Sequence, residues 1–192
     1  NMVETGEMLA LDQWAVERAA QLQQELLAAY DSYEFHQIYQ KVHNFCAVDM
    51  GGFYLDIIKD RQYPPQADSL ARRFGQRAMY HIVEAMSRWL APILSFTAEE
   101  IWEFMPGERG ASVFLEEWYL IPDVPGGDMG LAYWSQIMEV RDAVNRELEQ
   151  LRNAGEIGAN LQAEVTLYCG REIHDQLVKL ADELRFVLIT ST

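Results

Sequence analysis

The sequence predicts a mainly α-helical protein, in which a helical bundle is followed by a small α/β appendage. Two patterns indicate this fold. Apolar residues recur at spacings of three and four over most of residues 7–154, which is typical of amphipathic helices. After Gly155 the spacing changes to two, which is typical of a half-buried strand. The 192 residues are 49% hydrophobic, enough to bury a core, and this excludes a disordered protein.

Three long helices are expected in the first half of the chain. The second helix contains Gly51 and Gly52, which weaken it without ending it, and a Pro-Pro pair at 64–65 stops it. In the third helix Pro92 should introduce a kink or end the helix. The expected bounds are residues 7–30, 34–63 and 68–94.

A short fourth helix is expected after residue 97. Thr97 is placed as its N-cap, and Glu100, three residues later, completes a capping box. Residues 106–127 are rich in Pro and Gly and read as a long connection that packs back on the bundle. The apolar spacing then predicts a fifth helix over about 129–154.

The last part of the chain predicts the appendage. Residues 161–169 alternate between apolar and polar, as in a half-buried strand, and a helix is expected over about 173–184. The β-branched run at 186–190 predicts a second strand. The expected domains are a bundle over 1–127, a linking helix over 128–154 and a strand–helix–strand appendage over 155–192.

Several classes of protein are excluded by what the sequence lacks. Cys46 and Cys169 cannot form a disulfide framework or a zinc site of paired cysteine motifs, and free thiols suit a reducing cytoplasm. No apolar run is long enough to span a bilayer. The glycines match no phosphate-cradling loop, and neither a nucleophile elbow nor a zinc-protease motif occurs. We therefore expect no catalytic residue in this chain, which we place in the cytoplasm, free of membranes.

Two clusters of side chains have possible chemistry but are better explained as structural. His36, His43 and Cys46 share one side of the second helix, but no fourth ligand supports a metal site, and neighbouring Phe and Val residues favour packing. Glu99 and Glu103 lie near the capping Glu100 in a short helix, where acidic side chains favour the helix dipole more often than acid–base chemistry. We expect no metal site.

Positive charge is concentrated in one part of an acidic chain. The formal net charge is -15, from 15 Lys and Arg and 30 Asp and Glu. Residues 59–88 contain six Lys or Arg and three Asp or Glu, so this segment is +3, whereas the rest has 9 positive and 27 negative charges, or -18. Basic groups with interleaved tyrosines at an interhelical corner could hold a nucleic-acid backbone. The alternative is that these side chains pair with acids on neighbouring helices.

Several stretches resemble the anticodon-binding helical domain of bacterial isoleucyl-tRNA synthetases. The most specific is FYLDIIKDRQY at 53–63, followed by ARR at 71–73. The stretch RWLAPILSFTAEEIW at 88–102 is broader and also resembles the valyl and leucyl relatives. Further matches run in order from Leu11 to Thr190, so the resemblance covers nearly the whole chain.

The resemblance implies that the chain is a piece of a larger ligase that uses ATP to attach isoleucine to its tRNA. The catalytic signatures and the editing domain of the family do not occur here, so no residue of this chain receives the family's chemistry. The piece itself would need no cofactor, whereas the parent would use ATP and, in a C-terminal module, zinc. Its implied partners are tRNA and the rest of the synthetase, and the piece is expected to be monomeric.

The resemblance also favours the nucleic-acid interpretation of the basic corner. We expect phosphate contacts from its cations and base stacking from its aromatic residue, whereas Arg88 and Trp89 are expected to form an internal packing and ion-pair element. The candidate RNA-binding residues are Lys59, Arg61, Tyr63, Arg72, Arg73 and Arg77.

Two other functions stay open at this point. The chain could be the equivalent domain of a valyl- or leucyl-tRNA synthetase. It could also be a helical protein-interaction domain without RNA binding, because a net charge of -15 repels RNA over much of a surface. Binding to tRNA at low salt that is lost at high salt would separate an RNA-binding domain from a protein-interaction domain.

Overall fold

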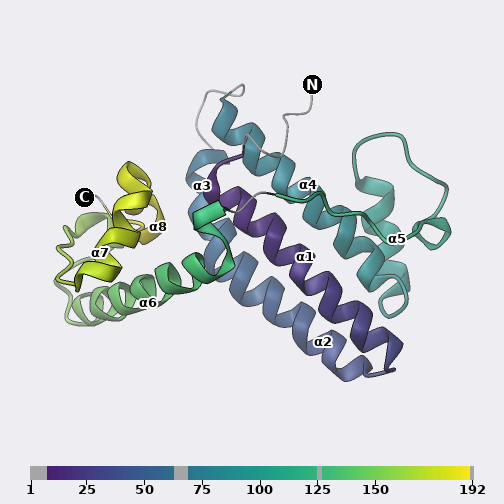
Figure 1. Ribbon diagram of the computed structural model, residues 1–192, viewed down its shortest axis with the longest axis horizontal. Coiled ribbons are helices and arrows are strands. Elements are labelled where there is room, and N and C mark those ends of the chain that lie inside the picture. The colour runs from purple at the N-terminus through teal and green to yellow at the C-terminus, as the bar shows by residue number, and fades with distance from the viewer. Residues whose placement is uncertain (1–7, 63–68, 125–126, 191–192) are drawn as a thin grey trace. The chain divides into compact units, whose positions relative to one another are not determined.

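The computed structural model describes residues 8–62, 69–124 and 127–190, with the side chains of residues 60–62 and 182 left out (Figure 1). The chain forms two compact units. We call Asn1–Gly126 the bundle unit and Gly127–Thr192 the C-terminal unit. All regular elements in the described residues are helices, so the predicted helical fold is confirmed.

The bundle unit begins with two antiparallel helical segments. Helix α1 (Ala10–Asp31) buries an unbroken apolar stripe, as its spacing predicts, and packs against the next segment. That segment is continuous but changes type: α2 (Phe35–Asn44) leads into a π-helix (Phe45–Tyr54) and then into α3 (Leu55–Gln62). The two glycines therefore do not end the helix. A Cβ on Gly51 would lie 3.1 Å from the carbonyl oxygen of Cys46, so a larger residue there would crowd the wide turns.

Helices α4 (Leu70–Leu90) and α5 (Ser95–Phe104) complete the bundle. Helix α4 packs against α1 and α3, and it ends before Pro92, as expected. Helix α5 covers the end of α4 through a core of Ala91, Ala98, Trp102, Met105 and Val113. The following residues are irregular apart from a short 3₁₀ turn at Val113–Leu115.

Buried polar contacts tie α1 to α4. The Gln23 side chain accepts a hydrogen bond from the Trp89 indole at 2.8 Å and donates one to the carbonyl of Tyr119 at 2.9 Å. The Tyr30 hydroxyl donates to the carbonyl of Trp89 at 2.6 Å. Trp89 is fully buried, and the expectation that it serves internal packing is confirmed. These bonds fix the end of α1 beside the end of α4.

Two details of the bundle differ from expectation. Helix α5 begins at Ser95, and its N-cap position, Leu94, has no side-chain cap, so the predicted capping box at Thr97 is wrong. The chain enters this helix from the turn after α4, where the backbone N–H of Leu94 already donates to the carbonyl of Leu90 at 2.7 Å. The three- and four-residue spacing of Phe35, Ile38 and Val42 predicts one buried stripe, but Phe35, in the first turn of α2, is 50% exposed.

The C-terminal unit is built on α6 (Leu131–Asn153), which packs against α7 (Arg171–Leu177) and α8 (Leu184–Leu188). A 3₁₀ segment, Val178–Glu183, joins α7 to α8, and another short one covers Asn160–Gln162. The hydrophobic core contains Val144, Leu148, Ala163 and Leu188. Tyr133 donates a hydrogen bond to the carbonyl of Gln176 at 3.1 Å, which holds α7 against α6.

The predicted α/β appendage is wrong. The second expected strand, residues 186–190, begins inside α8 and ends in a left-handed turn at Ile189. Residues 163–170 lie outside any helix or strand, and Val165 and Leu167 pack against the core as the alternation requires. A strand is completed only by hydrogen bonds to a neighbouring strand. With residues 184–188 helical, the alternating segment has no such neighbour within the described residues.

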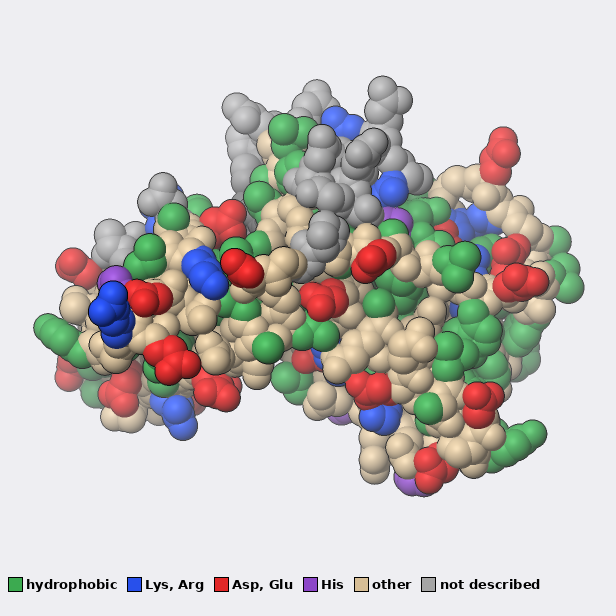
Figure 2. All heavy atoms as spheres, in the orientation of Figure 1, with side chains coloured by type: hydrophobic (Ala, Val, Ile, Leu, Met, Phe, Trp, Pro, Cys, Tyr) green, Lys and Arg blue, Asp and Glu red, His purple; other side chains and the backbone are tan. Residues whose placement is uncertain are grey.

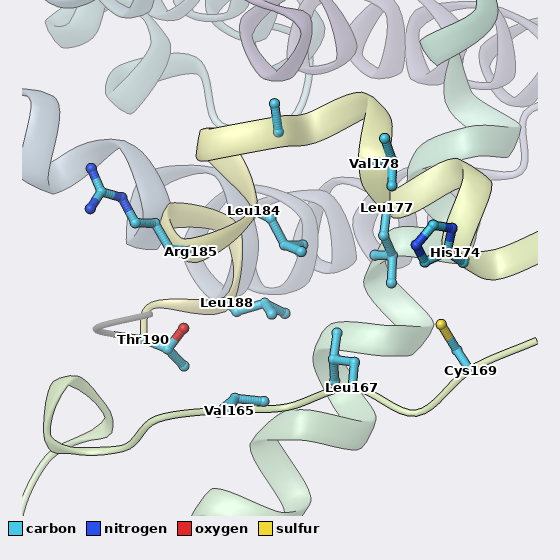
Figure 3. A pocket seen from close by; sticks show the side chains of 11 residues that line it. Val165, Leu167, Cys169, His174, Leu177, Val178, Leu184, Arg185, Leu188 and Thr190 are labelled. Atoms are coloured by element: carbon cyan, nitrogen blue, oxygen red, sulfur yellow. The ribbon is translucent and has the colours of Figure 1, made fainter.

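A cavity of about 570 Å³ opens between this segment and the two final helices (Figure 3). Val165, Leu167 and Leu188 point into it, and Arg185 and Thr190 lie at its edge. Its lining is mostly apolar. Within the described residues, no helix is both long enough and apolar enough to cross a bilayer.

Candidate nucleic-acid interface

The basic corner predicted from the sequence lies where α3 meets the start of α4. Lys59 is an exposed residue of α3, and Arg72, Arg73 and Arg77 lie in the first two turns of α4. Helices α3 and α4 pack against each other, so the structure brings these two groups to one corner. The side chain of Arg61 and the whole of Tyr63 lie outside the described residues, and their predicted roles stay predictions.

Local sequence explains how α4 presents its arginines. Ser69 caps the helix, and its Oγ accepts a hydrogen bond from the backbone N–H of Arg72 at 3.4 Å. Residues 70–77 contain no Asp or Glu, and all three arginines are half-buried. On α3 the ammonium of Lys59 lies 2.6 Å from the carboxylate of Asp56, on the surface. Exposed pairs of this kind contribute little and exchange readily with a charged ligand.

Arg77 differs from the other cations of the corner because it lies near a buried histidine. His81 is 4% exposed, and its Nδ1 lies 2.6 Å from the hydroxyl of Tyr119. Burial, helped by the positive charge of Arg77, lowers the pKa of His81 to about 4. The imidazole is therefore neutral near pH 7, and Arg77 contributes to the electrostatics of the interior as well as the corner.

The second half of α4 contains a buried ion cluster that the sequence did not single out. The Glu84 carboxylate lies 2.6 Å from the guanidinium of Arg88 and 2.7 Å from that of Arg109. Both guanidinium groups lie over the indole ring of Trp102, each 4.7 Å from its centroid. The ion-pair role expected for Arg88 is confirmed. Arg109 was missed because it is 25 positions from Glu84, and only the spacing of Glu84 and Arg88 is visible in sequence.

The charge state of Glu84 follows from these neighbours. Burial by itself would raise the pKa of this carboxyl, but hydrogen bonds from Arg109, Arg88 and Tyr80 outweigh it and lower the pKa. Glu84 is therefore negatively charged, and the guanidinium groups beside it compensate this charge inside the protein. The Glu116 carboxylate lies 3.7 Å from Arg88, so the cluster holds two acids and two guanidinium groups, and it links α4 to the irregular segment with little net charge.

The histidines of α2 are not where the sequence placed them. His36 and His43 were expected to pack at the core boundary, but both are exposed, as is Cys46. No three His, Cys, Asp or Glu side chains within the described ranges are grouped closely enough to hold a metal ion. The buried stripe of this helix is formed instead by Ile38 and Val42.

Acidic residues outnumber basic ones outside the segment 59–88, by 27 to 9. Figure 2 shows Asp and Glu side chains scattered over much of the visible face. The corner thus combines one exposed and three half-buried cations with an excess of acidic residues elsewhere in the chain. Such an arrangement attracts a polyanion to one place and repels it elsewhere.

Comparison with known proteins identifies the family. The family described as the anticodon-binding domain of tRNA ligase matches residues 12–167. The isoleucine–tRNA ligase of Alkalilimnicola ehrlichii is 62% identical over 187 residues, covering 96% of this chain and 20% of that protein. Those of Saccharophagus degradans and Nitrosococcus oceani are 57% and 58% identical over 193 residues, covering 100% and 98% of this chain and 21% and 20% of the two proteins.

The chain spans about a fifth of the length of the curated relatives it matches. The family match covers both the bundle unit and much of the C-terminal unit, including every described cation of the basic corner. The chain therefore belongs to the family of anticodon-binding domains of tRNA ligases, in the form found in isoleucine–tRNA ligases.

Proposed function

We propose that this chain holds the anticodon stem and loop of a tRNA for a larger isoleucine–tRNA ligase. The observation that carries the proposal is the family match over residues 12–167 together with identities above 55% to isoleucine–tRNA ligases. The whole enzyme would use ATP to attach isoleucine to the tRNA. The remainder of that enzyme would supply the catalytic and editing parts, and a zinc module would follow this chain.

The basic corner supplies the phosphate contacts in this proposal. Lys59 and Arg61 on α3, with Arg72, Arg73 and Arg77 on α4, would line the RNA backbone, and Tyr63 would stack on a base. Support comes from the packing of α3 on α4, which brings the described cations to one corner. Phosphate contacts of this kind position the RNA and carry no sequence information by themselves.

A salt series tests the proposal directly. The 192-residue chain should bind an isoleucine tRNA transcript, and its affinity should fall steeply between about 50 and 200 mM salt. In the double variant Arg72→Gln, Arg73→Gln, the slope of log K against log salt should decrease by about 1 for each lost contact. Fluorescence anisotropy of labelled tRNA measures both quantities.

The matched control changes the same charge elsewhere. Arg146 and Arg152 are exposed residues of α6, so Arg146→Gln, Arg152→Gln should leave the slope as in the unmodified chain. Equal slopes for the two double variants would remove Arg72 and Arg73 from the contact surface. No salt-dependent binding of tRNA by the unmodified chain would favour a protein-interaction domain, which the net charge of -15 suits.

A further inference from the structure

A row of exposed aromatic side chains follows the turn between α1 and α2. Tyr33, Phe35 and Tyr39 are 78%, 50% and 68% exposed, and His43 continues the row as an exposed residue one turn further. We call these four side chains the aromatic row. Phe35, Tyr39 and His43 are spaced by four residues, so they share one side of α2, about 6 Å apart along the helix axis. Figure 2 shows hydrophobic side chains reaching solvent at the lower right, where α1 and α2 meet.

The backbone at Tyr33 is unfavourable for the residue it holds. The N–H of Tyr33 donates to the carbonyl of Tyr30 at 3.1 Å, and the N–H of Glu34 donates to that of Ala29 at 2.8 Å. These two bonds form a Schellman motif, whose left-handed residue is normally glycine. Tyr33 occupies this position with φ of 58°. Because its ring is mostly exposed, burial does not explain why a tyrosine stands there.

The rings of the row are held in place by one another. Tyr33 and Phe35 meet edge to face with centroids 6.1 Å apart, and Phe35 meets Tyr30 in the same way at 6.2 Å. Tyr30 contacts Trp118 at 5.8 Å and is fixed by its hydrogen bond to Trp89. The ring of Tyr39 lies 5.8 Å from that of His43. The exposed faces are therefore preorganised.

The exposed surface of residues 33–44 is aromatic or polar. Its other exposed residues are Glu34, His36, Gln40 and Asn44, and exposed aliphatic side chains begin further along at Ala47 and Val48, the latter 55% exposed. The nearby Lys41 is engaged by Glu25 of α1. Exposed flat rings present π-faces on which unpaired bases stack.

We propose that the aromatic row is a stacking surface for unpaired nucleotides of the bound RNA. This inference rests on the proposed function and adds a second contact to it, distinct from the basic corner. Helix α4 separates the two: Arg73 lies in its first turn, whereas Trp89, which anchors Tyr30, lies sixteen residues later, about 24 Å along the axis. Phosphates of a stem would contact the corner, and loop bases would reach the row (Figure 1).

The test replaces rings by aliphatic side chains of similar bulk. In Tyr33→Leu, Tyr39→Leu, binding of an anticodon stem-loop hairpin should weaken on the order of ten-fold for each base that loses its ring. Binding of a blunt duplex with the same stem should not change. A 2-aminopurine placed in the loop should be quenched by the unmodified chain and not by the variant. The conservative variant Tyr33→Phe, Tyr39→Phe should retain both the affinity and the quenching.

Tyr168 provides the matched control, because it is 95% exposed in the C-terminal unit. The variant Tyr168→Leu should bind the hairpin as the unmodified chain does. If the unmodified chain binds the hairpin and the double Leu variant binds it equally well, the stacking surface is refuted and the proposed function stands. If the unmodified chain binds neither RNA, both fail. Unchanged hairpin binding together with altered self-association in sedimentation would reassign the row to contacts between protein chains and would also refute it.

Discussion

The two ends of α4 carry the same residue type in opposite roles. At its start, Arg72, Arg73 and Arg77 lie in two turns without an acidic residue. At its end, Arg88 lies 2.6 Å from Glu84, and the same carboxylate binds Arg109, which folds back from the irregular segment. One helix thus directs its first cations to a corner of the surface and its last cation into the interior.

The difference teaches how to interpret a cluster of basic residues. Arg88 was counted in the positive segment 59–88, yet a glutamate one helical turn earlier fixes it inside the protein. A buried ion pair neutralises its own charges and attracts no distant ligand. The spacing of acids along the helix therefore indicates which arginines form ion pairs within it, which the net charge of the segment does not.

The largest expected effect is at the inner end. Glu84→Ala would leave two guanidinium groups, 11% and 10% exposed, without their shared carboxylate. Breaking a buried ion pair from one side typically costs about 3–5 kcal/mol of the free energy of unfolding. Urea unfolding of the variant measures this. Glu103→Ala, an exposed change on α5, should cost less than about 0.5 kcal/mol, and equal costs for the two variants would contradict the comparison.

The pH dependence of stability tests the middle of α4. His81 has a pKa of about 4 in the fold against 6.5 ordinarily, so the unfolded chain takes up its proton first as the pH falls. The free energy of unfolding should therefore decrease from pH 6.5 to pH 4, by on the order of 3 kcal/mol from this group, and no further below. In His81→Asn this part of the pH dependence should vanish. An identical slope in both proteins would show that His81 is not buried as a neutral ring.

A smaller effect of opposite sign is expected at the turn beside the end of α4. Tyr33→Gly should raise the free energy of unfolding by about 1 kcal/mol, because glycine adopts the left-handed conformation without a Cβ clash. Thermal unfolding monitors the change. Tyr39→Gly, within α2, should instead destabilise by about 1 kcal/mol, since glycine is unfavourable inside a helix. Destabilisation by both would mean that the ring of Tyr33 contributes to packing.

The smallest effect is expected at the outer end. Arg73→Gln should cost less of the free energy of unfolding than Glu84→Ala, because Arg73 is half-buried whereas Glu84 is buried. Together with Glu84→Ala it compares the contributions of the two halves of α4 to stability. A loss of more than about 2 kcal/mol would place Arg73 in a buried network and contradict this comparison.

The helical bundle could be predicted because its signals are local. The stripe Leu11, Ala15, Leu22 and Leu26 is buried as its spacing predicts, and Pro92 follows the end of α4. The prediction of two strands was wrong because an alternating pattern specifies which side chains are buried and not whether a neighbouring strand exists. Val165 and Leu167 do pack inward, yet the segment that should pair with them forms α8.

For a related reason, only part of the candidate site could be predicted from the sequence. Charge counting found Lys59 and the arginines of α4, since they are close in sequence. It could not find Arg109, whose partner is 25 positions away, nor foresee that His36 and His43 face solvent. Contacts between distant segments depend on packing, and the change of helix type within the second segment leaves no periodic signature.

That change of helix type determines the rotational phase of α3. At 100° per residue, an unbroken α-helix that buries Ile38 and Val42 would turn Asp56 toward the same face. The π-helical turns of Phe45–Tyr54 each accommodate an extra residue, and Ile57 and Ile58 are buried instead. Straightening this segment into an α-helix without removing a residue would turn α3 and exchange isoleucine for aspartate at the core. The type of helical turn in this segment thus sets the direction in which Lys59 faces.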